Sequence, residues 1–66
     1  MNLLEQLEEV RTLKLEAIAK WDSLMRNSVS YERADFEGRK GILLGLIAGY
    51  SYTESILVKL LEECGG

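Results

Sequence analysis

Residues 41–56 read GILLGLIAGYSYTESI, and this stretch sets how many helices the chain forms. It begins with an apolar run that reaches Gly49, a residue type that commonly terminates a helix. Ser51 and Glu54 follow with the S-x-x-E spacing of a capping box, in which the two side chains bond to free backbone N–H groups of a new helix. The pattern predicts that one helix stops near residue 48 and that another covers 52–63. A single helix continuous through Gly49 is the alternative.

On the N-terminal side of this stretch, residues 31–48 predict a helix whose two halves differ. The first half is rich in charged residues and the second is almost wholly apolar, so we expect one end in water and the other buried. Ser30 stands where an N-cap is needed. Glu32 and Asp35 fall in the next turn, where the helix dipole favours acids.

Residues 2–27 predict a long amphipathic helix. At about 100° per residue, one side gathers apolar side chains, namely Leu3, Leu7, Val10, Ala17, Ile18, Trp21, Leu24 and Met25. With Leu4, Leu13 and Leu15 the apolar arc spans roughly 200°, against an arc of about 100° or more for an ordinary surface helix. An arc this wide indicates contact with two neighbours.

The fold class that follows is all-α, in a single domain over residues 1–66. We expect a helical hairpin plus a third, shorter helix. A core of this size is marginal, and small domains add disulfides, metals or partner subunits. With one Cys the chain cannot form an internal disulfide, and without His it lacks the commonest metal ligand. In addition, 47% of the residues are hydrophobic. Copies are therefore expected to assemble as a homo-oligomeric helical bundle.

Glycines in residues 38–49 indicate close helix packing. A glycine inside a helix costs up to about 1 kcal/mol relative to alanine, so several of them require a reason. Gly38, Gly45 and Gly49 fall on one side of the helix and form a smooth strip that another backbone can approach. The residues expected at the oligomer interface are Leu7, Val10, Ala17, Trp21, Gly38, Gly45 and Gly49.

Composition also excludes functions. Without His, the commonest general base and metal ligand is absent, so we expect no enzyme, no metal site and no cofactor. A formal charge of −3 argues against a nucleic-acid partner. Residues 46–56 resemble the turn entering a helix-turn-helix module, but the only cation in the helix after it is Lys59, which is poorly suited to reading bases.

The expected location is the cytoplasm. Residues 1–10 lack the basic and apolar regions of a signal peptide. The longest apolar run, 41–50, is about half the length that crosses a bilayer, so no membrane contact is expected.

Several polar residues could bind an anionic small molecule. Lys14 lies near the centre of the apolar arc, where an ammonium needs a partner such as a Glu of another helix, a snorkelling route to water, or a ligand. Arg39 and Lys40 lie between two glycines and could face an anion. The candidate ligand-binding residues are Lys14, Tyr31, Arg33, Arg39 and Lys40.

One acidic pattern resembles an enzyme family. Glu5-x-x-Glu8 followed by Glu32-x-x-Asp35 looks like the paired acidic motif of the all-α nucleoside-triphosphate pyrophosphatases, and the resemblance implies magnesium binding. It covers four residues. In a hairpin that turns near residue 28 the two acidic pairs lie roughly 25–36 Å apart, so only a partner subunit could bring them together.

These observations predict a non-catalytic small helical homo-oligomer that acts by binding, as a regulatory or inhibitory protein-interaction module. The alternative is a small oligomeric protein that sequesters an anionic, nucleotide-type signalling ligand, in the manner of viral proteins that counter bacterial defence. A magnesium-dependent pyrophosphatase-like enzyme is the third reading.

Overall fold

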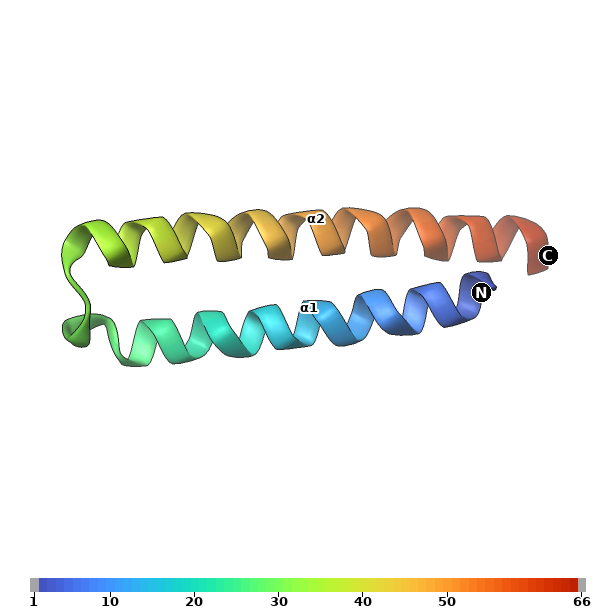
Figure 1. Ribbon diagram of the computed structural model, residues 1–66. Helices are drawn as coiled ribbons and strands as arrows, with labels where there is room; N and C mark the ends of the chain where they lie inside the picture. The colour runs from blue at the N-terminus through green and yellow to red at the C-terminus, as the bar shows by residue number, and fades with distance from the viewer. Residues whose placement is uncertain (1, 66) are drawn as a thin grey trace.

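The computed structural model describes residues 2–65, which form an antiparallel helical hairpin (Figure 1). Helix α1 covers Leu3–Arg26, a short 3-10 turn η1 covers Ser28–Ser30, and helix α2 covers Arg33–Gly65. No strand occurs within residues 2–65, which confirms the all-α class. The two helices lie side by side with both ends of the chain at the same end of the molecule (Figure 1).

Helix α1 begins and ends close to the predicted positions. At its start, the Asn2 side chain accepts a hydrogen bond of 2.8 Å from the backbone N–H of Glu5. This bond satisfies one of the donors that a helix N-terminus leaves free. At its end, the backbone N–H of Asn27 donates to the Ser23 carbonyl at 3.0 Å. The prediction of a helix over 2–27 is confirmed to within one residue at each end.

The connection between the helices differs from the predicted one. Ser30 is the last residue of the 3-10 turn and donates its backbone N–H to the Asn27 carbonyl at 2.9 Å. Tyr31 is extended, and α2 starts at Arg33. The first backbone bond at this end runs from the Phe36 N–H to the Glu32 carbonyl. Ser30 therefore does not act as the N-cap of α2.

The prediction of a separate third helix over 52–63 is wrong, because α2 runs unbroken through Gly49. None of the described glycines has a positive φ, so Gly49 keeps a helical conformation and does not end the helix. Thr53 donates its hydroxyl to the Gly49 carbonyl at 2.9 Å, one turn back along the same helix. The turn of the helix-turn-helix resemblance over 46–56 is absent for the same reason.

The core is narrow because only two helices contribute to it. Its buried side chains are Leu7, Ala17, Leu24, Leu43 and Leu57. The molecule measures 49 × 16 × 14 Å, with a radius of gyration of 15.1 Å. A compact domain of this length has a radius of about 11 Å. The hairpin is thus an elongated rod, and most of its surface faces away from the core.

Helix α2 is also the most apolar part of the molecule. Among the described residues it alone is long and apolar enough to cross a membrane, by length and composition, and its most apolar 18-residue window has a mean hydropathy of 1.4. The core helix of a soluble protein, which is mostly buried, passes the same criterion, whereas 11% of this window is buried within the chain. The apolar run of 41–50 alone is too short to cross a bilayer, but the segment that is poor in charge is longer. Residues 41–58 contain a single charged residue, Glu54.

Candidate functional site

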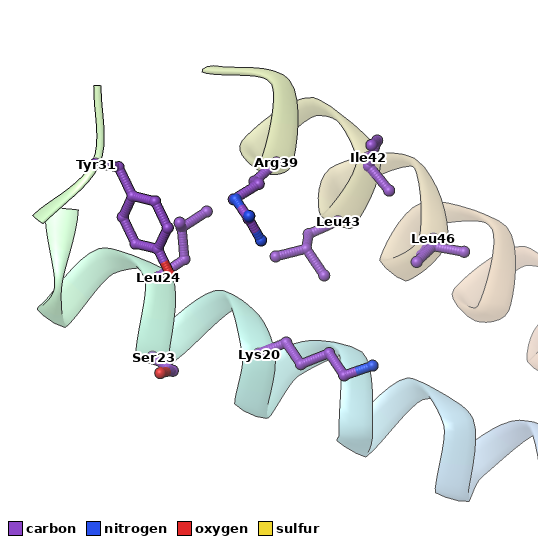
Figure 2. Close-up of a pocket in the computed structure, with 8 residues that line it drawn as sticks. All are labelled: Lys20, Ser23, Leu24, Tyr31, Arg39, Ile42, Leu43 and Leu46. Carbon is purple, nitrogen blue, oxygen red and sulfur yellow. The ribbon is translucent and has the colours of Figure 1, made fainter. Parts of the chain in front are cut away.

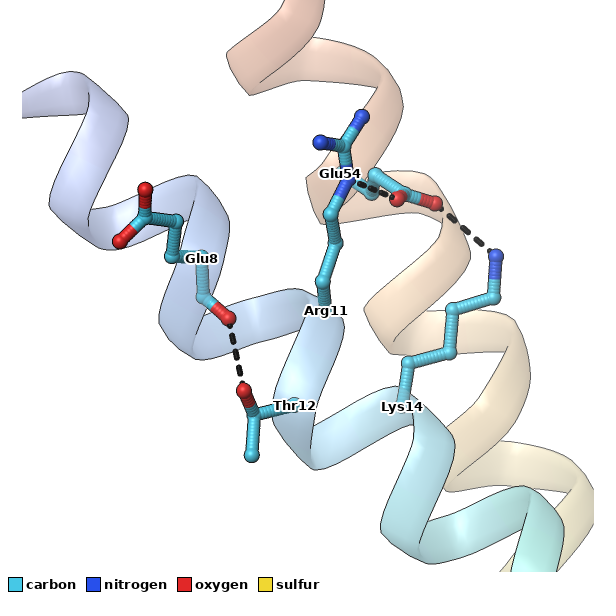
Figure 3. A network of polar contacts seen from close by, with 5 residues as sticks. All are labelled: Glu8, Arg11, Thr12, Lys14 and Glu54. Atoms are coloured by element: carbon cyan, nitrogen blue, oxygen red, sulfur yellow. Dashed lines mark hydrogen bonds and ion pairs between the residues drawn. The ribbon is translucent and has the colours of Figure 1, made fainter.

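A cluster of three charged side chains joins the two helices (Figure 3). The Glu54 carboxylate of α2 accepts a hydrogen bond from Lys14 Nζ at 2.9 Å and another from Arg11 Nε at 2.8 Å. The side chains of Lys14 and Glu54 are 27% and 21% exposed, so this ion pair is partly shielded from water. Of the alternatives left open for Lys14, the structure shows a Glu of another helix, supplied by the same chain.

The same contacts set the charge of Glu54. Hydrogen bonds from Lys14 first and from Arg11 second lower the pKa of this carboxyl below its ordinary value of 4.5. Each donor favours the ionised form because it stabilises a negative oxygen. The glutamate that the sequence pattern placed in a capping box therefore binds the other helix instead.

A groove lies between α1 and α2 near the loop (Figure 2). Tyr31 and Arg39 stand at its loop end, with the Arg39 guanidinium 5.1 Å from the centre of the Tyr31 ring. That distance is typical of a cation–π contact. Lys20, from α1, also lines the groove, and its side chain extends along α1 away from the loop (Figure 2).

The wall of the groove is mainly aliphatic. It consists of Leu24, Ile42, Leu43 and Leu46, with the hydroxyl of Ser23 at one edge. Leu24 and Leu43 are core residues, whereas Ile42 is 67% exposed and Leu46 is 41% exposed. The groove has a volume of about 410 Å³, within the range of about 300–1,000 Å³ for small-molecule sites.

A second surface lies on the side of α2 that faces away from α1. We call this the outer face of α2, and its residues are Gly38, Gly41, Gly45, Gly49, Tyr52, Ile56 and Leu60, all of them exposed. Nothing lies within 4 Å of the position that a Cβ would occupy on any of the four glycines. The glycines therefore have no role in packing α2 against α1.

The structure brings together only part of the predicted ligand site. Tyr31 and Arg39 share the groove, while Arg33 and Lys40 do not line it. Lys14 lies at the Glu54 cluster, away from the groove. Lys20 was missed, because its place beside the groove depends on how the two helices pair, which no local pattern reveals.

The predicted interface residues on α1 lie on its core side. Leu7 and Ala17 are 3% and 4% exposed and are covered by α2 of the same chain. Val10 and Trp21 are half-buried. The large apolar residues that α1 leaves exposed are Leu4, Leu15 and Ile18.

The acidic motif does not form a metal site within one chain. No group of three or more metal-ligating side chains is present among residues 2–65. Glu5 and Glu8 lie at the start of α1, and Glu32 and Asp35 lie beside the loop at the opposite end of the rod.

Comparisons with protein-family models, curated proteins and solved structures give no match for this chain.

Proposed function

We propose that this protein is a non-catalytic helical homo-oligomer that acts by binding, as a regulatory or inhibitory interaction module. The observation that carries the proposal is the outer face of α2, which is exposed, rich in glycine and free of charge over residues 41–58. A surface helix of a soluble monomer normally presents charged residues to water. Here the one charged residue of that segment, Glu54, binds α1 instead.

The exposed area supports a second copy as the occupant of this face. The chain exposes 4949 Å², whereas a folded monomer of 7.5 kDa exposes about 4,250 Å². The excess of about 700 Å² is close to the area of about 800 Å² that each partner buries in a standard interface. Dimerisation or higher assembly would remove that excess.

The glycines suit a helix as the contacting element. Small residues let two helix backbones approach closely, which increases van der Waals contact along the whole length of the interface. The glycines and exposed apolar side chains of the outer face span Gly38 to Leu60, most of the length of α2. An α2–α2 contact around this face would use the glycines for close approach and would bury the exposed apolar side chains of the same surface.

The experiment is a measurement of molar mass in solution by light scattering, made on the wild type and on two matched variants. Ile56→Glu places a charge on the outer face, at a residue that is 42% exposed. Ile18→Glu makes the same change on α1, at a residue that is 39% exposed. The wild type and Ile18→Glu are expected to be oligomers, and Ile56→Glu is expected to be a 7.5 kDa monomer of unchanged helicity.

A wild-type monomer contradicts the proposal, and so does an Ile56→Glu protein that keeps its oligomeric mass. A third outcome is a wild-type chain that is monomeric in buffer and floats with lipid vesicles. In that case the outer face contacts lipid, and the proposal of a second copy is wrong.

A further inference from the structure

The groove at the loop end of the hairpin combines two features that the pairing of the helices does not use. Its cations, Lys20 and Arg39, are exposed, and neither has an ion-pair partner among the described residues. Its outer aliphatic side chains, Ile42 and Leu46, are also exposed. We propose that this groove binds a small amphipathic anion, a molecule that joins one carboxylate or phosphate group to an extended alkyl body.

The charge of the groove favours an anion. The whole chain has a formal charge of −3, yet the residues that line the groove include two cations and no acid. A guanidinium binds carboxylate and phosphate oxygens through two parallel N–H donors. Stacking on the Tyr31 ring, with the guanidinium carbon 5.1 Å from its centre, restricts the Arg39 side chain before any anion arrives. Arg39 therefore places the anionic group at the loop end, while the Lys20 side chain, which extends away from the loop (Figure 2), adds positive charge farther along the groove.

The lining of the groove favours an alkyl body over a nucleoside. Four of its eight lining residues are aliphatic. The hydroxyls of Ser23 and Tyr31 are its only uncharged polar side-chain groups. A base and a ribose carry many donors and acceptors that such a wall leaves without partners, and each unpaired group lowers affinity. An alkyl chain has none and gains affinity with every CH₂ that it buries.

This site is separate from the outer face of α2. The two surfaces share no residue, and the groove lies between the helices, whereas the outer face lies opposite α1. Binding in the groove and assembly through α2 can therefore be tested independently.

The experiment is isothermal titration calorimetry with decanoate and with decyl phosphate, both below their micelle concentrations. Neutral 1-decanol and adenosine monophosphate serve as the comparison ligands. The matched variants are Arg39→Gln and Arg33→Gln, since both arginines are exposed on α2 and only Arg39 lines the groove. Circular dichroism and a measurement of molar mass check that each variant keeps the wild-type fold and assembly.

Decanoate or decyl phosphate is expected to bind the wild type and Arg33→Gln equally. Arg39→Gln should bind it about tenfold more weakly, which is the scale of one hydrogen bond to a charged group. Binding by decanoate alone or by decyl phosphate alone supports the site and identifies its head group. Arg39→Lys keeps the charge without the paired donors and should lie between the wild type and Arg39→Gln.

Four results overturn the proposal. Equal binding of 1-decanol and decanoate shows that no anion is recognised, and equal losses in Arg39→Gln and Arg33→Gln show only general attraction of charge. Binding of adenosine monophosphate without binding of either alkyl anion shows that the groove takes a nucleotide. The absence of heat with all four ligands also removes the idea.

Discussion

At the scale of single residues, Glu54 takes part in every side-chain hydrogen bond that joins the two helices in the described part of the chain. It is the only charged residue in residues 41–58, and it lies on the side of α2 that faces α1. Both oxygens of its carboxylate accept bonds from α1, one from Lys14 and one from Arg11. These partners are 40 and 43 residues away in the sequence, so the contacts align α2 against α1 in one register.

We predict that the stability of the hairpin falls in acid because of this carboxyl. The pKa of Glu54 is lower in the folded chain than its ordinary value of 4.5, so folding favours the ionised form. Its contribution is complete above pH 4.5 and is lost as the pH falls through the lower folded pKa. Glu54→Gln should therefore melt below the wild type at pH 7, and the gap should close in strong acid. Thermal melting followed by circular dichroism measures both.

The control for that prediction is Glu9→Gln, which removes an exposed carboxylate that has no ion pair in the described part of the chain. Exposed carboxylates contribute little to stability, so this variant should melt close to the wild type. A gap between Glu54→Gln and the wild type that stays constant from pH 7 down to strong acid contradicts the role assigned to Glu54.

At the scale of elements, the continuity of α2 shows how a long-range contact can override a local signal. Ser51 and Glu54 have the spacing of a capping box, and Gly49 precedes them, yet no cap forms. A cap would satisfy free backbone donors, but an unbroken helix satisfies the same donors with its own carbonyls. It also leaves the Glu54 side chain free to bind α1. The sequence alone predicted α1 almost to the residue, because its periodicity is a property of one helix.

Prediction of the site was limited in the same way, because contacts between two helices cannot be read from the periodicity of one. The place of Lys14 in the apolar arc was enough to predict an acidic partner, although not that the partner would be Glu54. Tyr31 and Arg39 were both candidates, each from its own surroundings, and both line the groove. Lys20 belongs to the groove only because α1 presents it beside α2, and the relative rotation of two paired helices is a tertiary property.

The glycines of α2 carry a prediction about helix stability. Because Gly41 is helical and nothing lies within 4 Å of its potential Cβ, alanine fits without strain. Gly41→Ala should raise the free energy of unfolding by about 0.5–1 kcal/mol, since alanine loses less backbone freedom on folding. Denaturant unfolding at one fixed protein concentration measures the change. Because Gly41 belongs to the outer face, the measurement is made in the Ile56→Glu background, which is expected to be monomeric, and a decrease there contradicts the helical environment assigned to this residue.

Gly49→Ala is the matched comparison, since Gly49 has the same open surroundings in the single chain. If helix propensity alone operates, its gain equals that of Gly41→Ala. A smaller gain at Gly49, measured under conditions where the chain is an oligomer, indicates that a second chain approaches the backbone there. The difference between the two variants thus locates close packing on the strip predicted from Gly38, Gly45 and Gly49.

At the scale of the whole molecule, the hairpin has one interface where a larger domain has several. Each helix covers the other along a single side, and only five side chains in the described residues are buried. The rest of the apolar surface includes Leu15 at 66% exposed and Tyr52 at 71% exposed. A chain with a core this small gains stability from whatever covers its remaining apolar surface.

The last prediction follows from coupling between assembly and folding. If copies associate through the outer face of α2, only folded chains bind one another, so mass action stabilises the folded state as the protein concentration rises. The melting temperature of the wild type should therefore increase over a hundredfold range of concentration. Ile56→Glu should melt at a lower temperature that does not depend on concentration, while Ile18→Glu should follow the wild type. A wild-type melting temperature that is constant over this range means that the two-helix rod is stable alone, and its narrow core then accounts for all of its stability.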